Sequence, residues 1–238
     1  MTDPAIRDAL LGALDEPVDA LEANRPPPSA GKGLRNAWWS ARNRIADLVR
    51  DRGLDTTGIE YRGEHLHGER VRYEPSGWSY LQRALPRESV APDEVFLDYG
   101  SGKGRIVYQA ARYPFARVIG VEVSEELNEV ARANIERKRR KLACGDVELV
   151  TADAAGFDVP DEVTVAYLFY PFVGDTFRAV MGKLVESLER RPRRVRLIYV
   201  CPVLQDEVLA TGRFRLERML PGGRRDVVGR RIGVYVSS

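Results

Sequence analysis

The chain has 238 residues, of which 44% are hydrophobic and 30% are charged, a composition typical of a globular protein with a hydrophobic core. Its 37 basic and 35 acidic residues give a net charge of +2, which excludes a strong overall attraction to nucleic acid or to a membrane surface. The two cysteines are too few for a disulfide framework, no apolar run is long enough to span a bilayer, and the first residues do not resemble a secretory signal. The sequence therefore predicts a cytoplasmic protein with reduced thiols and no membrane segment.

The N-terminal part of the chain is predicted to be mostly helical. Apolar residues recur at helical spacing within residues 1–23 and again within 34–52, and a proline-rich linker separates the two stretches. We expect residues 1–33 to form an appendage and residues 34–89 to form a helical cap or lid beside the main domain.

A pair of histidines, His65 and His67, lies within residues 54–77, which are predicted to form a loop or a hairpin. Two histidines supply at most half of the ligands of a typical zinc site. No third ligand is apparent nearby in the sequence, so we predict that the protein binds no metal.

After a short predicted helix over residues 78–85, strand and helix patterns alternate. Strands are predicted over 94–99, 117–122, 147–151, 163–169 and 194–200, and helices over 103–112, 124–141 and 174–190. Two further strands are predicted over 213–219 and 231–236, and the short connection between them makes them antiparallel. Residues 90–238 are therefore predicted to form an α/β domain with a Rossmann-like, seven-stranded, mostly parallel sheet and an antiparallel C-terminal hairpin.

A glycine-rich turn follows the first predicted strand. The strand ends in Asp98, and Gly100, Gly102 and Gly104 follow it before the next helix. A phosphate-binding P-loop would need a Ser or Thr at 104, and a nicotinamide-dinucleotide loop would need a glycine at 105. Glycines here let the backbone bend sharply and let a ligand approach it closely.

The pattern Asp-x-Gly-x-Gly-x-Gly at residues 98–104 resembles that of the class I S-adenosylmethionine-dependent methyltransferases. The resemblance implies that the glycine backbone lies close to the amino-acid tail and ribose of the cofactor, and that Asp98 lies near its ammonium group. Two more acids follow the next two strands. Glu122 is placed to accept the two ribose hydroxyls, as in dinucleotide folds, and the family resemblance implies that Asp153 accepts from the adenine amino group.

The remaining expected contacts of S-adenosyl-L-methionine lie beside these acids. They are Tyr73, Gly100, Ser101, Gly102, Gly104, Val123, Ala154 and Phe169.

The residues Tyr170, Pro171 and Phe172 follow the fourth strand, where the family holds the acceptor atom. Amine-methylating members often carry Asn/Asp-Pro-Pro-Tyr at this place, and this chain has Tyr170 and Phe172 at two of those positions. We expect the triplet to be the catalytic segment and to orient either an amine or an apolar or aromatic acceptor. Packing in the core is the alternative role of the triplet.

The stretch Tyr73-Glu74-Pro75-Ser76 is similar to one in a bacterial branch of the family. That branch is distantly similar to the non-SET lysine methyltransferases, which act on histones. The resemblance implies that a protein lysine is one class of acceptor and a small molecule another.

A run of basic residues ends the helix predicted over 124–141. These charges complement the helix dipole, and few aromatic residues lie among them, so a nucleic-acid substrate is possible but not favoured. The sequence predicts methyl transfer to an unidentified acceptor. The alternatives are an NAD-dependent oxidoreductase and a non-catalytic module that binds S-adenosylmethionine, and the sequence does not indicate an oligomeric state.

Overall fold

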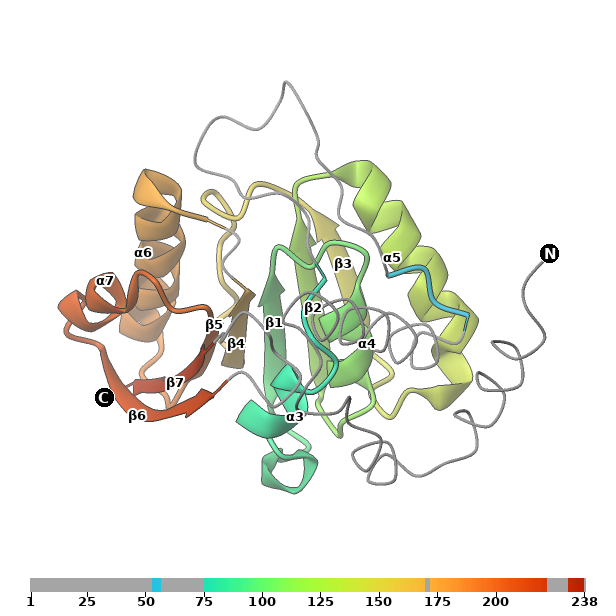
Figure 1. The fold of residues 1–238 in the computed structure, drawn as a ribbon, viewed down its shortest axis with the longest axis horizontal. Coiled ribbons are helices and arrows are strands. Elements are labelled where there is room, and N and C mark those ends of the chain that lie inside the picture. Colours follow the sequence, from blue (N-terminus) through green and yellow to red (C-terminus); the bar gives the residue numbers. More distant parts are fainter. Residues whose placement is uncertain (1–52, 57–74, 170–171, 222–230, 238) are drawn as a thin grey trace, which may run out of the picture. The chain divides into compact units, whose positions relative to one another are not determined.

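The computed structural model describes residues 53–56, 75–169, 172–221 and 231–237 (Figure 1). All of them belong to one of the two units into which the chain divides, residues 53–238. The helices predicted over residues 1–23 and 34–52 lie outside the described residues, as do His65, His67 and most of the loop or hairpin predicted over 54–77.

The centre of the described unit is a seven-stranded sheet with the strand order β3-β2-β1-β4-β5-β7-β6. Strands β1 to β5 run parallel, whereas β7 is antiparallel to both β5 and β6. The predicted mostly parallel sheet with an antiparallel C-terminal hairpin is therefore confirmed. The strands are β1 (Val95–Tyr99), β2 (Arg117–Glu122), β3 (Val147–Thr151), β4 (Val163–Phe169), β5 (Arg196–Val200), β6 (Phe214–Pro221) and β7 (Arg231–Ser237).

Helices connect the parallel strands except between β3 and β4, and they cover both faces of the sheet (Figure 1). The helix predicted over 124–141 is divided, since the α-helix ends at Lys138 and a 3-10 turn follows. A six-residue helix after β5 was not predicted, because it is too short for a clear apolar period. The helices are α3 (Tyr80–Ala84), η2 (Arg87–Ser89), α4 (Arg105–Ala111), α5 (Glu125–Lys138), η3 (Arg139–Lys141), α6 (Gly174–Arg190) and α7 (Gln205–Ala210).

Two hydrophobic clusters hold the helices against the sheet, one on each face. Phe96 and Tyr167 lie in the cluster with α3 and α4, and the neighbouring strand residues Leu97 and Leu168 lie in the cluster with α6. Side chains alternate between the two faces along a strand. Because both faces are covered, the central strands are apolar along their whole length rather than alternating with polar residues.

The strand order also fixes where a ligand can bind. From β1 the chain builds β2 and β3 on one side, and it then returns to build β4 and β5 on the other side. In such a sheet the loops at the carboxyl ends of β1 and β4 diverge, which opens a crevice at this edge. Every described helix is too short or too polar to cross a bilayer.

Candidate functional site

The glycine loop joins the end of β1 to the start of α4. Gly100, Gly102 and Gly104 have φ angles of 71°, 53° and 79°, in the left-handed region that favours glycine. The amide groups of Gly100 and Ser101 both donate to the carbonyl oxygen of Val121, at 2.9 and 3.0 Å. The loop therefore turns sharply at the crevice and is fastened to β2.

Gly104 leaves little room for a side chain. A Cβ atom there would lie 3.0 Å from the Cβ and 3.3 Å from the Cα of Ala131, and φ is already 79°. We expect Gly104→Ala to lower the free energy of unfolding by about 1–3 kcal/mol, because it adds backbone strain to a close contact. Urea unfolding would measure this change.

The matched control is Gly182→Ala in α6, where an added Cβ meets nothing within 4 Å. This substitution should raise stability by about 0.5–1 kcal/mol, since glycine is a poor helix residue. Equal stability of the wild-type protein and Gly104→Ala would contradict the strain argument.

Asp98 lies in β1 with only 3% of its surface exposed. Its neighbours in register are Gly120 on β2 and Tyr167 on β4. Within the part of the chain that the structure describes, no group donates a hydrogen bond to this carboxylate. Burial, and secondarily the nearby charge of Glu122, raise the pKa of Asp98 well above its ordinary value. A buried carboxylate in this setting suits a cationic ligand group.

Glu122 is the last residue of β2, and it binds the glycine loop directly. Its Oε2 atom accepts from the amide of Gly102 at 2.9 Å, and its Oε1 atom accepts from the amide of Ser124 at 3.0 Å. These bonds use two of the roughly four acceptor sites that a carboxylate offers. Glu122 thus fixes the shape of the loop at the end of β2.

The third acid, Asp153, follows β3 at the same edge of the sheet. It is exposed, and its Oδ1 accepts from the amide of Ala155 at 3.1 Å, a bond typical of a turn-forming aspartate. Val123, directly after Glu122, is 41% exposed, whereas Ala154 is 4% exposed and packs in the core. Of these three predicted cofactor contacts, Asp153 and Val123 are therefore exposed and Ala154 is buried.

The predicted catalytic triplet is only partly described. Tyr170 and Pro171 lie outside the described residues, as does Tyr73. Phe172 is 7% exposed and belongs to the same hydrophobic cluster as Phe177. Phe169 ends β4 with its ring edge-on to that of Tyr80, the two ring centres being 6.3 Å apart. Phe172 is thus the one described member of the triplet, whereas the predicted cofactor contact Phe169 is half-buried.

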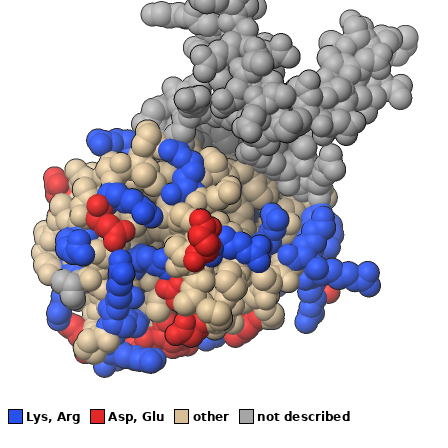
Figure 2. Space-filling model, turned by 90° about the horizontal axis from the view of Figure 1, so that it is seen from below, with Lys and Arg blue, Asp and Glu red and all other residues tan. Residues whose placement is uncertain are grey.

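Several basic side chains at the end of α5 form ion pairs or hydrogen bonds within the protein. Arg132 pairs with Glu125, Arg139 pairs with Glu136, and Arg137 donates to the carbonyl of Gly53. Figure 2 shows Lys and Arg side chains scattered over one face with Asp and Glu between them. The charges on this face do not form one continuous basic surface.

Metal and thiol chemistry have little support in the described part of the chain. No group of three or more His, Cys, Asp or Glu side chains that could hold a metal ion occurs there. Both cysteines are free, and Cys144 is buried.

Four residues near the glycine loop were missed by the sequence analysis, namely Ser76, Arg105, Asn134 and Tyr167. They form buried polar contacts around the loop. A sequence signal existed for Asn134, which continues the stripe of Leu127 and Ala131 on the buried side of α5. A polar residue in such a stripe indicates a buried hydrogen bond.

Comparison with known proteins gives a family match over the strands and helices around this loop. Residues 96–191 match a family model described as a methyltransferase domain. A protein-lysine N-methyltransferase of Saccharolobus islandicus is 31% identical over 100 residues, which are 42% of this chain and 60% of the relative.

Two further similarities have lower identity. The H3 lysine-79-specific histone-lysine N-methyltransferase of Cryptococcus neoformans is 27% identical over 128 residues, which are 48% of this chain and 19% of the relative. A crystal structure of an RNA methyltransferase from Salinibacter ruber in complex with S-adenosyl-L-homocysteine has a TM-score of 0.49 and 22% identity, covering 69% of this chain and 94% of that chain. The chain therefore spans less than two thirds of the curated relatives described here.

Proposed function

The chain carries a methyltransferase domain of the class I S-adenosylmethionine-dependent type, and on this premise we propose that it methylates the side-chain amine of lysine residues in a protein substrate. The observation that carries the cofactor part of the proposal is the position of Asp98, Glu122 and Asp153 at the carboxyl ends of three adjacent parallel strands. The support for the acceptor is that both curated relatives above are named as lysine methyltransferases.

Each acid suits a different part of S-adenosylmethionine. The buried Asp98 would hold the ammonium group of the amino-acid tail, because an unsolvated carboxylate gains most from a cation. Glu122 would accept the ribose hydroxyls in charge-assisted bonds. Asp153 would accept from the adenine amino group, with Val123 and Ala154 beside the ring and Phe169 at the end of β4. The backbone of Gly100, Ser101, Gly102 and Gly104 would lie along the tail and ribose.

S-adenosylmethionine supplies an electrophilic methyl group on a sulfonium that leaves as a neutral thioether. The protein's task is then to align the acceptor with this methyl group and to exclude water, and such alignment can supply most of the acceleration. The lysine nitrogen uses its lone pair to form the new N–CH₃ bond as the S–CH₃ bond breaks, and it gives up a proton to solvent. In this proposal the segment Tyr170-Pro171-Phe172 after β4 orients the amine, with Phe172 packed in the core.

The proposal is tested first by binding and then by transfer. Calorimetric titration of the full chain should show micromolar binding of S-adenosylmethionine and S-adenosylhomocysteine and none of NAD. The protein is next incubated with methyl-tritiated cofactor and a bacterial protein extract, alongside the same extract with its lysines blocked by acetylation. Label should enter the untreated proteins only.

The other outcomes separate the alternatives. Equal labelling of the two extracts would exclude lysine as the acceptor, while labelling removed by ribonuclease would indicate RNA. Tight binding of the cofactor without transfer to any acceptor would favour a non-catalytic binding module. Binding heat in the titration with NAD, but not with S-adenosylmethionine, would favour an oxidoreductase.

A further inference from the structure

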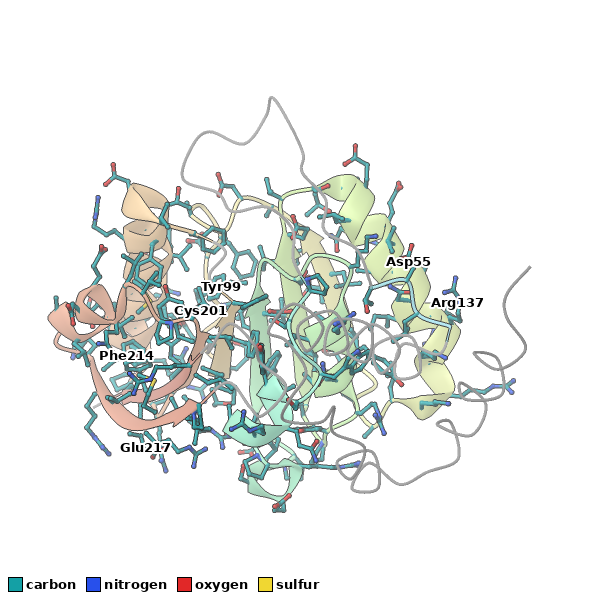
Figure 3. The ribbon with its side chains drawn as sticks, viewed as in Figure 1. Asp55, Tyr99, Arg137, Cys201, Phe214 and Glu217 are labelled. Carbon is teal, nitrogen blue, oxygen red and sulfur yellow. The ribbon has the colours of Figure 1, made fainter. Side chains whose placement is uncertain are left out.

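A short segment from outside the sheet is fastened to the back of the glycine loop. In residues 53–56, Leu54 is 8% exposed and Thr56 is fully buried. Asp55 lies beside α5 (Figure 3), and Arg137 of that helix donates to the carbonyl of Gly53 at 2.7 Å. This segment has no regular secondary structure of its own, so its position depends on contacts with side chains.

Asn134 makes the central contact. Its side chain is 1% exposed, and its Nδ2 donates to the carbonyl oxygens of Asp55 and Lys103, at 2.9 and 3.0 Å. Its Oδ1 accepts from the amide of Asp55 at 2.8 Å. One amide side chain therefore binds the segment as a neighbouring strand would and also holds the glycine loop at Lys103.

Arg105, the first residue of α4, makes the second contact. Its guanidinium is buried and donates to Thr56 Oγ1 at 2.8 Å, to the Thr56 carbonyl at 3.1 Å and to the Ser76 carbonyl at 3.0 Å. It also lies over the ring of Trp78, 5.1 Å from the ring centre. The planar guanidinium of Arg105, with its fixed donors, therefore joins residues 53–56 and 75–78 to the end of the glycine loop.

A further hydrogen bond links this segment to Tyr167, the strand neighbour of Asp98. The hydroxyl of Tyr167 donates to Ser76 Oγ at 3.1 Å, and Tyr167 is paired in register with Asp98. We name residues 53–56 and 75–78, together with Asn134 and Arg105, the loop brace. The brace contacts the glycine loop at Lys103, is continuous with it at Arg105, and contacts the sheet at Tyr167, beside the buried acid.

We propose that Asn134 and Arg105 are positioning residues that hold the glycine loop in the shape that receives S-adenosylmethionine. The inference rests on the proposed function and extends it to residues that need not touch the cofactor. Three glycines within residues 100–104 make the free loop conformationally diverse. A loop that is fixed before binding loses less entropy when the ligand binds, so the brace increases affinity.

The test uses two conservative variants. Asn134→Asp keeps the shape of the side chain but replaces a donor to two carbonyl oxygens with an acceptor. Arg105→Lys keeps the charge but loses the planar fork. Each should weaken binding of S-adenosylmethionine and S-adenosylhomocysteine about tenfold in calorimetric titration. In the ligand-free protein, hydrogen exchange of the amides of residues 100–105 should be faster than in the wild type, and saturating cofactor should restore protection.

The control is Ser187→Ala. Ser187 is fully buried in α6 and bonds Asp161 and Arg193 at 3.0 and 2.8 Å, away from the glycine loop. Ser187→Ala should lower the stability of the protein without changing its cofactor affinity or the hydrogen exchange of residues 100–105. Affinities of both brace variants within twofold of the wild type, or unchanged exchange at residues 100–105, would overturn the proposal. If the wild-type protein binds no cofactor, the proposed function fails, while the exchange experiment still decides whether the brace holds the loop.

Discussion

Asp98→Asn should make the ligand-free protein more stable near neutral pH and should weaken S-adenosylmethionine binding by about 30-fold or more. The binding loss follows because removing one partner of a buried charge pair typically costs about 2–5 kcal/mol. The stability gain follows because the carboxylate is buried without a donor in the described residues, and Glu122 is a like charge nearby. The amide has no charge to bury.

The stability difference between Asp98→Asn and the wild-type protein depends on pH, and the raised pKa of Asp98 determines its sign. Since the folded-state pKa of Asp98 is raised, its protonated form stabilises the protein at low pH, and this contribution is lost as the pH rises through the folded pKa. Thermal unfolding at several pH values should show the wild-type protein losing stability relative to Asp98→Asn as the pH rises. Affinity for the cofactor should rise over the same range, because the cation binds the ionised carboxyl.

A ligand without the amino-acid tail of S-adenosylmethionine provides the control for Asp98. 5′-Methylthioadenosine has the ribose and adenine of the cofactor but neither its ammonium nor its carboxylate. Asp98→Asn should bind it as the wild-type protein does. Unchanged affinity of this variant for S-adenosylmethionine, or an unfolding curve that follows the wild type at every pH, would show that Asp98 does not meet the ammonium group.

Glu122→Gln should weaken S-adenosylmethionine, S-adenosylhomocysteine and 5′-methylthioadenosine alike, by about 100-fold. The carboxylate accepts from the amides of Gly102 and Ser124 with its two oxygen atoms. A glutamine would turn an NH₂ group toward one of these N–H donors, so the loop would lose a bond and the ribose would lose an acceptor. Calorimetry with the three ligands measures each loss.

The two acids are therefore matched controls for one another. Asp98→Asn should discriminate between ligands with and without the amino-acid tail, and Glu122→Gln should not. If Glu122→Gln affected only the ligands that carry the tail, the assignment of Glu122 to the ribose would be wrong. Hydrogen exchange at Gly102 would separately report whether the loop contact is lost.

Much of the fold was determined by local patterns in the sequence. The predicted strands at residues 117–122, 147–151 and 163–169, and the helix at 174–190, have the bounds found in the structure. Apolar runs and helical periodicity depend on neighbouring residues, so they can be recognised along the chain. The glycine loop was equally visible, because its geometry requires glycine at positions with positive φ.

The positions of Asp98, Glu122 and Asp153 at one edge also followed from the sequence. Parallel strands joined by helices bring their carboxyl ends together, so acids at successive strand ends must gather there. The sequence did not reveal how differently these acids are placed. Asp98 is buried, Glu122 binds the loop with both oxygen atoms, and Asp153 caps its own turn.

Only the tertiary structure decided which polar side chains support the loop. Asn134 meets Asp55 across 79 residues of sequence, and Tyr167 meets Ser76 across 91. Such bonds depend on how α5 and β4 pack against segments that carry no periodic pattern. The burial of Phe172 beside Phe177 was decided in the same way. A local pattern gives the type of each element, but the partner of a buried polar group is fixed only when distant elements close around it.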